Sequence, residues 1–355
     1  MTESWVEPMG LLQGRTAALA VAADLALPLA GGPAAFTMVR LIGADAPEGP
    51  IPLADVPASW QDRVVKLSAP PASFAGLDLP HVSGRPLIMG IVNVTPDSFS
   101  DGGRYAGHAD AIDAGHALLE AGADLLDIGG ESTRPGAIPV PPEEECRRVL
   151  PVIRELSKAS MISIDTRNAA TMLASLEAGA EIVNDVTALR HDPAAARVLG
   201  RSEASVILMH MLGDDPRTMQ QGIAYADVAL EVAQFLADRV AAVERMGIPR
   251  GRIAIDPGIG FGKRLPQNLA LMERLPLLAN IGCPIVFGAS RKRFIGTLSG
   301  VDEAGDRMAG SVAAALHAAT QGASILRVHD VAETAQALAV WTAIHAGIPE
   351  EEEEA

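Results

Sequence analysis

Polar residues end most of the apolar runs in the later three quarters of the chain. They are Asn93, Asp127, Asp165, Asn184 or Asp185, His210, Asp256, Ser290, Arg327 and His329. Any one of them could simply cap a helix or tie a turn. Capping does not explain why three carboxylates, two amides and several cations recur at the same point of successive runs. If the runs are parallel strands, their carboxyl ends meet at one face, so we expect one polar pocket there.

The carboxylates and the amide predict recognition of a flat, nitrogen-rich ring. Asp165 and Asp256 could each accept from two adjacent N–H donors of such a ring, and Asn184 could both donate and accept. This half of the pocket suits a heterocycle.

The cations predict an anion site in the other half. The segment "GASRKRFIG" supplies Arg291, Lys292 and Arg293 at a strand-to-helix turn. Arg327 and His329 of "RVHD" leave the same face of an extended strand. Together with a helix N-terminus, these groups suit a phosphate.

The glycine-rich segment "DPGIGFGK" (256–263) fits neither a dinucleotide fingerprint nor a Walker loop, because the spacing differs and no Ser or Thr follows Lys263. Its glycines are expected to allow tight turns and a close ligand beside Phe261. His210 is more often structural than a ligand in such a setting, and Met209 could line the pocket or fill the core. The order Ser-His-Asp and the motif HExxH are both absent from the sequence.

The elements that position these residues repeat along the chain from Leu87 onward, where short β-type runs alternate with longer helical patterns. The runs lack an apolar/polar alternation, which is typical of parallel strands covered on both faces. Eight of them in about 260 residues predict a (β/α)8 TIM barrel, with a doubly wound open sheet as the alternative. The expected strands are 87–93, 123–128, 161–165, 181–185, 205–210, 253–256, 284–288 and 324–328.

The ends of the chain break this rhythm. Residues 1–80 are rich in Ala, Pro and Gly and predict a small α+β extension or accessory domain, with possible strands at "FTMVRLIG" and "DRVVKLS". The Pro-rich "DAPEGPIP" and "SAPPASFAGLDLP" are expected to be connecting loops. The barrel is expected over 85–348, and the acidic segment 349–355 is expected to be a solvated, disordered tail.

Composition limits the possible partners. The 355 residues are 48% hydrophobic with a formal net charge of -16, which favours a globular protein and argues against a nucleic-acid or anionic-membrane binder. The apolar stretch 17–30 is interrupted by Asp24 and reads as neither a signal peptide nor a membrane span. Cys146 and Cys283 lack zinc-site spacing, so reduced thiols and a cytoplasmic protein are expected.

Several segments together resemble the dihydropteroate synthase family. They are "GIVNVTPDSFSDGG", "DIGGESTRPGA", "SIDT", "VNDV", "LMHM", "DPGIGFGK", "GASRKRFIG" and "RVHDV", in that order over about 87–347. The resemblance implies a (β/α)8 barrel that joins 6-hydroxymethyl-7,8-dihydropterin diphosphate to 4-aminobenzoate, giving 7,8-dihydropteroate and diphosphate. It also implies Mg²⁺ as cofactor and a homodimer.

The resemblance assigns roles to residues at matching positions. The implied pterin-binding residues are Asp165, Asn184, Met209, Asp256, Phe261, Lys292 and Arg327. The implied diphosphate-binding residues are Asn93, Thr133, Arg134, Arg327 and His329, with Asn93 also a metal ligand. The implied aminobenzoate-binding residues are Phe99, Thr133, Pro135, Lys292 and Arg293. The implied catalytic residues are Asp97, Asp101, Lys292, Arg327 and His329.

Two local features concern the aminobenzoate end. Many family members have Ser, which meets the aminobenzoate carboxylate, where this chain has Arg293. Here the backbone N–H and the helix N-terminus are expected to bind the carboxylate, and the cation could add to that attraction. The segment "STRPGA" carries no insertion after Pro135, so we expect sulfonamides to compete with aminobenzoate. The loop 95–103 is expected to close over the site together with that segment.

Two alternative functions remain open from the sequence. A pterin-binding methyltransferase would share the Asp and Asn residues but would not need the Arg327 and His329 pair. A catalytically silent paralogue could bind a pterin as a sensor or a partner protein.

Overall fold

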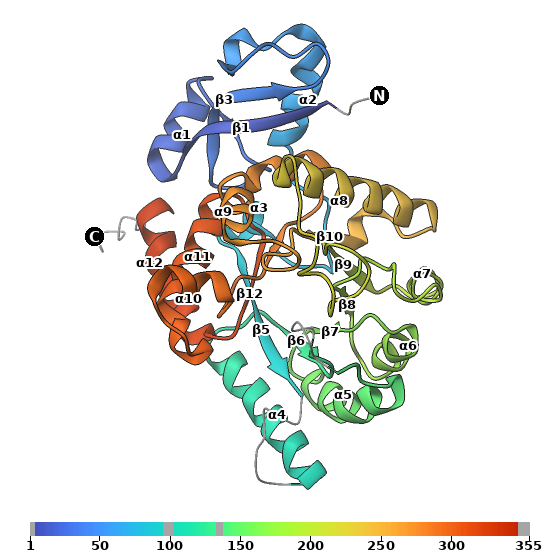
Figure 1. The fold of residues 1–355 in the computed structure, drawn as a ribbon. Coiled ribbons are helices and arrows are strands. Elements are labelled where there is room, and N and C mark those ends of the chain that lie inside the picture. Colours follow the sequence, from blue (N-terminus) through green and yellow to red (C-terminus); the bar gives the residue numbers. More distant parts are fainter. Residues whose placement is uncertain (1–3, 95–102, 133–137, 347–355) are drawn as a thin grey trace, which may run out of the picture.

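The computed structural model describes residues 4–94, 103–132 and 138–346, with only the backbone described at 103–106 and 346 (Figure 1). The described chain forms a small N-terminal unit and a larger α/β barrel. In the described part, no helix is both long enough and apolar enough to cross a membrane.

Eight parallel strands form the ring at the centre of the barrel (Figure 1). They are β5 (Leu87–Asn93), β6 (Leu125–Gly129), β7 (Ile162–Asp165), β8 (Ile182–Asp185), β9 (Ser205–Met209), β10 (Ile253–Asp256), β11 (Val286–Phe287) and β12 (Ile325–Val328). Their order is β10-β9-β8-β7-β6-β5-β12-β11, and a parallel bridge from Ile255 to Ile285 joins the two ends. The predicted TIM barrel is therefore confirmed, and the open-sheet alternative is wrong because the edges meet.

Helices surround the ring and follow the strands in the expected alternation (Figure 1). They are α4 (Gly103–Glu120), α5 (Pro142–Leu156), α6 (Ala169–Glu177), α7 (Ala195–Gly200), α8 (Val228–Arg245), α9 (Leu265–Glu273), α10 (Arg293–Ser299), α11 (Met308–Thr320) and α12 (Val331–Ala346). Short 3₁₀ segments add η3 (Arg250–Arg252), η4 (Leu275–Ile281) and η5 (Ala304–Arg307). The α-helices bury their apolar faces on the outside of the ring.

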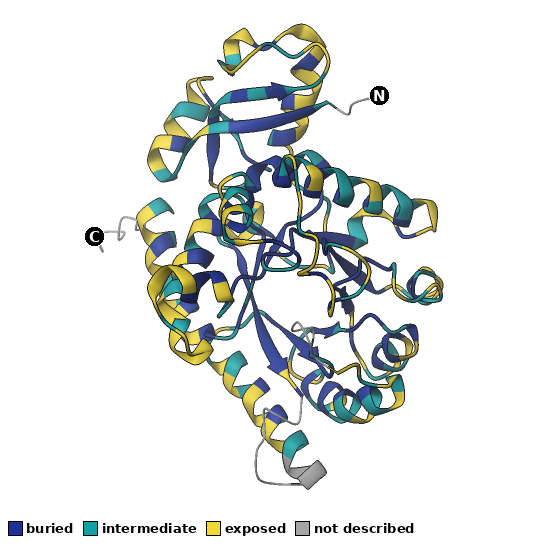
Figure 2. Cartoon of the chain, viewed as in Figure 1, coloured by how far each residue is buried: buried dark blue, intermediate teal, exposed yellow. Residues whose placement is uncertain are grey.

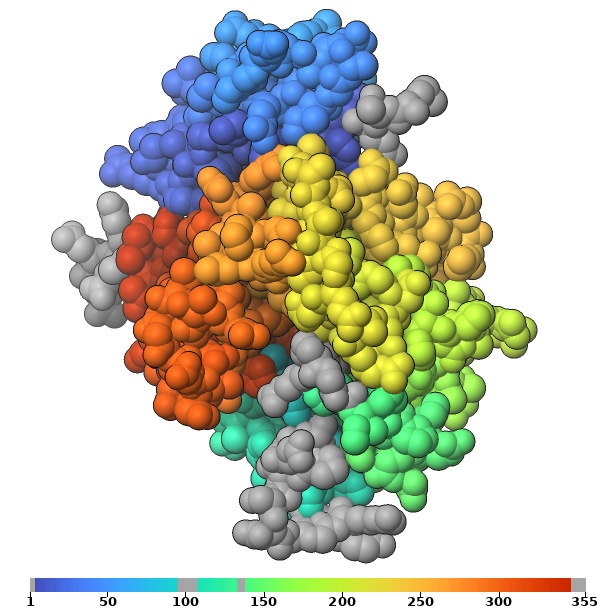
Figure 3. All heavy atoms as spheres, viewed as in Figure 1, coloured from blue at the N-terminus to red at the C-terminus, as the bar shows by residue number. Residues whose placement is uncertain are grey.

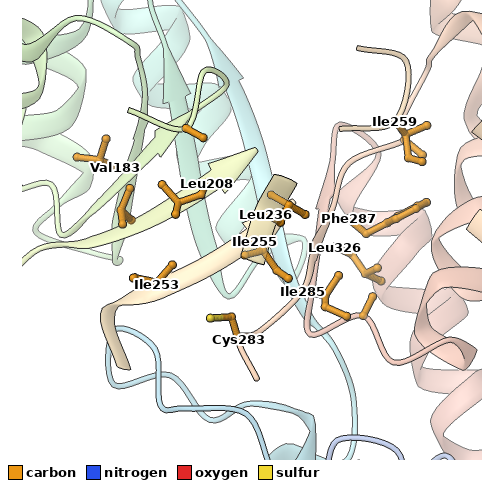
Figure 4. Packing of buried hydrophobic residues seen from close by; sticks show 14 of the residues in the cluster. Val183, Leu208, Leu236, Ile253, Ile255, Ile259, Cys283, Ile285, Phe287 and Leu326 are labelled. Atoms are coloured by element: carbon orange, nitrogen blue, oxygen red, sulfur yellow. The ribbon is translucent and has the colours of Figure 1, made fainter. Parts of the chain in front are cut away.

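Both faces of the strands are buried, which explains why their sequences are mostly apolar (Figure 2). Alternate residues of one strand enter two different clusters: Ile88 of β5 packs under the helices, whereas Leu87 and Met89 pack inside the ring. Figure 4 shows part of the outer cluster, where Leu236 of α8 lies beside Ile255 and Leu208.

The inner cluster closes one end of the ring, and we call it the barrel floor. Its strand residues are Leu87, Met89, Leu125, Ile182, Ile207, Ala254, Val286 and Ile325. Phe74 and Leu79, from the loop before the barrel, complete it and are 0% and 1% exposed. The Pro-rich segment predicted as a loop therefore also supplies core residues.

The N-terminal unit is a four-stranded antiparallel sheet with two main helices. Its elements are β1 (Trp5–Leu12), α1 (Gly14–Ala22), β2 (Leu27–Pro28), β3 (Ala35–Ile42), β4 (Pro50–Pro52), η1 (Leu53–Asp55) and α2 (Ala58–Ser68), and the short α3 (Pro80–Ser83) follows. The predicted α+β character and the strand at 36–43 are confirmed.

The strand predicted at "DRVVKLS" is wrong, because this segment is the second half of α2. Trp60, Val64 and Leu67 are buried, and their spacing of four and three residues places them on one helical face. Val65, the second β-branched residue of the run, is 61% exposed.

The N-terminal unit is bonded to the barrel, and the two surfaces meet in Figure 3. The side-chain amide of Asn280 in η4 accepts from the backbone N–H of Val6 and donates to its carbonyl, at 3.1 and 2.7 Å. Glu7 accepts from Arg40 and from Arg274, and Arg274 donates in turn to both oxygens of Asp227, the N-cap of α8. These contacts fix the unit against η4 and the N-terminal end of α8.

Candidate active site

A layer of charged and amide side chains lies inside the ring above the floor, and we call it the mouth layer: Asp127, Asp165, Asn184, Asp256, Lys292 and Arg327. Arg327 of β12 lies at its centre. Its Nη2 donates to Asp165 Oδ2 at 2.7 Å, and its Nε donates to Asp127 Oδ2 at 2.6 Å. Asn184 Nδ2 donates to the same Asp127 oxygen at 3.0 Å. The ring thus brings four strand ends into one hydrogen-bonded group.

Asp127 is a member of the mouth layer to which the sequence assigned no role. It was visible as the polar end of a strand, but its partners lie 57 and 200 residues away in sequence. Its side chain is 0% exposed, and its second oxygen, Oδ1, has no hydrogen-bond partner among the described residues.

Two glycines leave space within the mouth layer. A side chain at Gly129, which pairs with Asp165 and Asn93, would point between those two residues. A side chain at Gly288 would point between Arg327 and Asp256. The absence of side chains there leaves room for a flat ligand between the polar groups.

The glycine-rich loop after β10 forms one wall. Asp256 Oδ1 accepts from the backbone N–H of Gly258 at 2.6 Å, and Lys292 Nζ donates to the carbonyl of Ile259 while lying 4.4 Å from the centre of the Phe261 ring. A Cβ at Gly258, where φ is +66°, would lie 1.9 Å from the carbonyl oxygen of His210. Glycine is therefore required by both space and backbone conformation.

Burial shifts the pKa of the charged groups of the mouth layer. Burial raises the pKa of Asp165 to about 7, with the Arg327 charge opposing this shift and the Asp127 charge adding to it. Burial also raises the pKa of Asp256, which Lys292 opposes. Burial lowers the pKa of Lys292 to about 8, and the charge of Asp256 limits the fall. Perturbed groups in one pocket are typical of functional sites.

His210 has a structural role, the one that sequence reasoning favoured. It is 5% exposed, and its Nδ1 lies 2.8 Å from Nζ of the buried Lys263, which also donates to the carbonyls of Gly258 and Phe261. Burial lowers the pKa of His210 to about 2, so the ring is neutral. This pair ties the end of β9 to the glycine-rich loop.

Met209 and Phe261 lie together beside the mouth layer. They pack with Val186, Met211 and Met219 in a separate apolar cluster, in which Met209 is 4% exposed. The cluster gives the site an apolar side next to its charged one, as a heterocycle site requires.

The predicted cations divide between the site and other contacts. His329 is fixed by Ser290, whose Oγ accepts from the backbone N–H of His329 and lies 3.0 Å from its Nδ1. Arg291 instead pairs with Asp330, so it is committed to a structural ion pair. Arg293 is exposed at the first position of α10.

Asn93 lies exposed at the tip of β5, next to the space above Gly129. The described residues contain no group of three or more His, Cys, Asp or Glu side chains arranged to hold a metal. A single amide oxygen fits Mg²⁺, because this ion usually keeps waters and takes its other ligands from a bound phosphate.

Six of the predicted site residues lie outside the described residues, so their predicted roles stay predictions. They are Asp97, Phe99, Asp101, Thr133, Arg134 and Pro135.

Comparisons with known proteins agree with this geometry. The family model for pterin binding enzymes matches residues 89–329, so it spans the barrel and not the N-terminal unit. A dihydropteroate synthase of Neisseria meningitidis serogroup B is 50% identical over 266 residues, which cover 73% of this chain and 93% of that protein.

Solved structures give the same result. A Xanthomonas albilineans dihydropteroate synthase with 4-aminobenzoic acid is 51% identical, with a TM-score of 0.70, covering 75% of this chain and 94% of that one. A Yersinia pestis dihydropteroate synthase in a sulfonamide drug complex is 41% identical, with a TM-score of 0.69, covering 74% and 94%.

Proposed function

This chain belongs to the dihydropteroate synthase family of pterin binding enzymes, and from that premise we propose that its mouth layer joins a pterin diphosphate to 4-aminobenzoate. The chain is a transferase whose products are 7,8-dihydropteroate and diphosphate. The observation that carries the assignment is the convergence of Asp165, Asn184 and Asp256 with Lys292 and Arg327 at the carboxyl ends of the strands.

The pterin ring would take the place between the two carboxylates. Asp165 and Asp256 accept from N–H groups of the ring, and Lys292 donates to a ring acceptor. Met209 and Phe261 cover its apolar faces. Because the Arg327 guanidinium donates to Asp165, ring binding at Asp165 must compete with that contact.

The diphosphate would lie toward Arg327, His329 and Asn93. Arg327 and His329 bind its oxygens and stabilise the charge that develops when the C–O bond breaks. Asn93, with the diphosphate oxygens and water, would hold Mg²⁺, which when bound would neutralise further leaving-group charge. The electron-rich ring stabilises the cationic methylene that remains, so the displacement is dissociative.

Aminobenzoate then attacks the methylene with its neutral amine. This nucleophile needs positioning more than a strong base, and no covalent intermediate with the protein is required. Arg293 and the backbone at the start of α10 attract the carboxylate. Lys292 lies next to Arg293 and so borders both substrate sites.

The alternatives differ in what they require. The relatives named above are synthases, which favours this reading over the methyltransferase. A catalytically silent paralogue would bind the pterin and release no product, so an assay separates it from an enzyme.

The test is a product assay with purified protein, pterin diphosphate, aminobenzoate and magnesium. We expect dihydropteroate and diphosphate in equal amounts. Pterin binding without either product would favour the silent paralogue, and the absence of both binding and product would contradict the assignment.

Three further properties are proposed from family membership. We expect sulfonamides to inhibit in competition with aminobenzoate, so that added aminobenzoate restores the rate. A homodimer is expected by sedimentation, and a cytoplasmic location by cell fractionation.

A further inference from the structure

Asp127 lies beneath the residues that are expected to touch the pterin. It is two residues beyond Leu125 of the floor and two residues before Gly129, which pairs with Asp165. Its side chain is 0% exposed, and Arg327 and Asn184 both bond to one of its oxygens. A residue in this position acts through its neighbours rather than by touching the ligand.

We propose that Asp127 is a positioning residue for the pterin reaction. It holds both the Arg327 guanidinium and the Asn184 amide in place when Asp165 gives up its hydrogen bond with Arg327 and binds the pterin ring instead. This inference rests on the proposed function of the same pocket.

The contact with Asn184 decides which end of the amide meets the ligand. A carboxylate has no proton to give, so only the amide nitrogen of Asn184 can face Asp127 at 3.0 Å. The carbonyl oxygen then points away from Asp127. Asn184 thereby presents an acceptor, which matches the donor-rich edge expected to face Asp165.

The contact with Arg327 decides what happens when the ring enters. In the structure the guanidinium has two carboxylate partners, Asp165 at Nη2 and Asp127 at Nε. If the pterin ring binds Asp165, the hydrogen bond from Arg327 Nε to Asp127 remains. Because the guanidinium is a rigid plane, a bond at Nε restricts its orientation and leaves the Nη groups available for the diphosphate.

The charge of Asp127 also acts on Asp165. The charged groups that face Asp165 are Arg327 from β12, Lys292 at the start of α10, Asp127 from β6, Glu145 from α5 and Asp185 from β8. Arg327 and Lys292 favour the ionised carboxylate, and the three acids disfavour it. Removing the charge of Asp127, while freeing Arg327 to pair more closely with Asp165, must therefore lower the pKa of Asp165.

The test is Asp127→Asn, which keeps the size but removes the charge and one acceptor. We expect KM for the pterin diphosphate to rise by about tenfold or more, as loss of a charged hydrogen bond typically does, with KM for aminobenzoate within about twofold. We also expect the acid limb of kcat/KM to move to lower pH, which a general loss of structure would not cause. The matched control is Ser163→Ala, at the position of β7 that pairs with Asp127. Its buried hydroxyl has no hydrogen-bond partner in the described part, so its loss should change neither KM value nor the acid limb.

A second variant separates geometry from charge and serves if Asp127→Asn does not fold. Asp127→Glu keeps the charge but moves the acceptor by one methylene, so it should raise the same KM without shifting the acid limb. Equal changes in the two KM values, or no change in either, would overturn the proposal. Inactive wild-type protein would instead contradict the proposed function itself.

Discussion

The two ends of the barrel interior are built from the same strands but from opposite chemistry. Leu125 of β6 and Ile325 of β12 belong to the floor, and two residues later on the same strands Asp127 and Arg327 belong to the mouth layer. The floor is sealed by Phe74 from outside the ring, whereas the mouth layer holds charges whose pKa values burial has shifted. We infer that the apolar floor stabilises the fold, whereas the buried charges of the mouth layer lower its stability.

The largest expected effect is at the floor. Phe74→Ala should lower the free energy of unfolding by about 3–5 kcal/mol, because it removes a fully buried aromatic ring that closes the cluster. KM for both substrates should stay unchanged. Urea denaturation measures the loss, with Val82→Ala as control, since Val82 is 64% exposed. A loss below about 1 kcal/mol would mean that the linker does not seal the barrel.

The opposite result is expected at the mouth. Asp256→Asn should lower kcat/KM by about 100-fold, because an amide presents an N–H where the ring requires an acceptor. The melting temperature should not fall, since burial already disfavours the ionised carboxylate. The exposed Asp306→Asn is the control, and unchanged pterin affinity in Asp256→Asn would refute its role.

The N-terminal unit should behave like the floor. Glu7→Gln should reduce the free energy of unfolding by about 2 kcal/mol, because Glu7 is 5% exposed and accepts charged hydrogen bonds from both Arg40 and Arg274. As a control, Glu48→Gln at an exposed position should leave the free energy of unfolding unchanged in the same denaturation experiment. If kcat/KM changed as much as stability did, the unit would be part of the site and the comparison would fail.

The pH dependence of kcat/KM should come from the mouth layer alone. Asp165 must be ionised to accept, so kcat/KM should rise as pH increases through about 7. Lys292 must be protonated to donate, so kcat/KM should fall as pH increases above about 8. Each limb should approach tenfold per pH unit in initial rates at low substrate. A flat profile across both values would contradict the assignment of these two groups.

The smallest effect is expected at the rim. Arg293→Ala should raise KM for aminobenzoate about threefold, with less effect at high salt, because an exposed cation is screened by water and ions. Arg201→Ala, an exposed cation at the end of α7, should leave KM unchanged. An unchanged KM in Arg293→Ala would assign the carboxylate to the backbone of α10.

The barrel was predictable from sequence because its strands are short and mostly apolar, with polar residues at or near their carboxyl ends that the parallel arrangement must bring together. The structure of the N-terminal unit was harder to predict from the sequence. The run Val64–Val65 suggested a strand, although only the burial of Trp60 with Val64 reveals the helical face. β1 contains Pro8 and Gly10 and forms its ladder with β3, about thirty residues later, which local patterns do not indicate.

The site was predictable by residue type but not by pairing. Arg291 and Arg327 look alike in the sequence, yet Arg291 pairs with Asp330 on the barrel rim and Arg327 lies at the centre of the mouth layer. Asp127 could be placed at a strand end, but its two partners come from β8 and β12 and follow only from closure of the ring.

The most direct test of the account measures kcat/KM and the free energy of unfolding on the same samples of wild type, Phe74→Ala and Asp256→Asn. The account predicts that Phe74→Ala is less stable and fully active while folded, and that Asp256→Asn is as stable as wild type and nearly inactive. A Phe74→Ala protein that loses activity while folded, or an Asp256→Asn protein that keeps it, would contradict the division between floor and mouth.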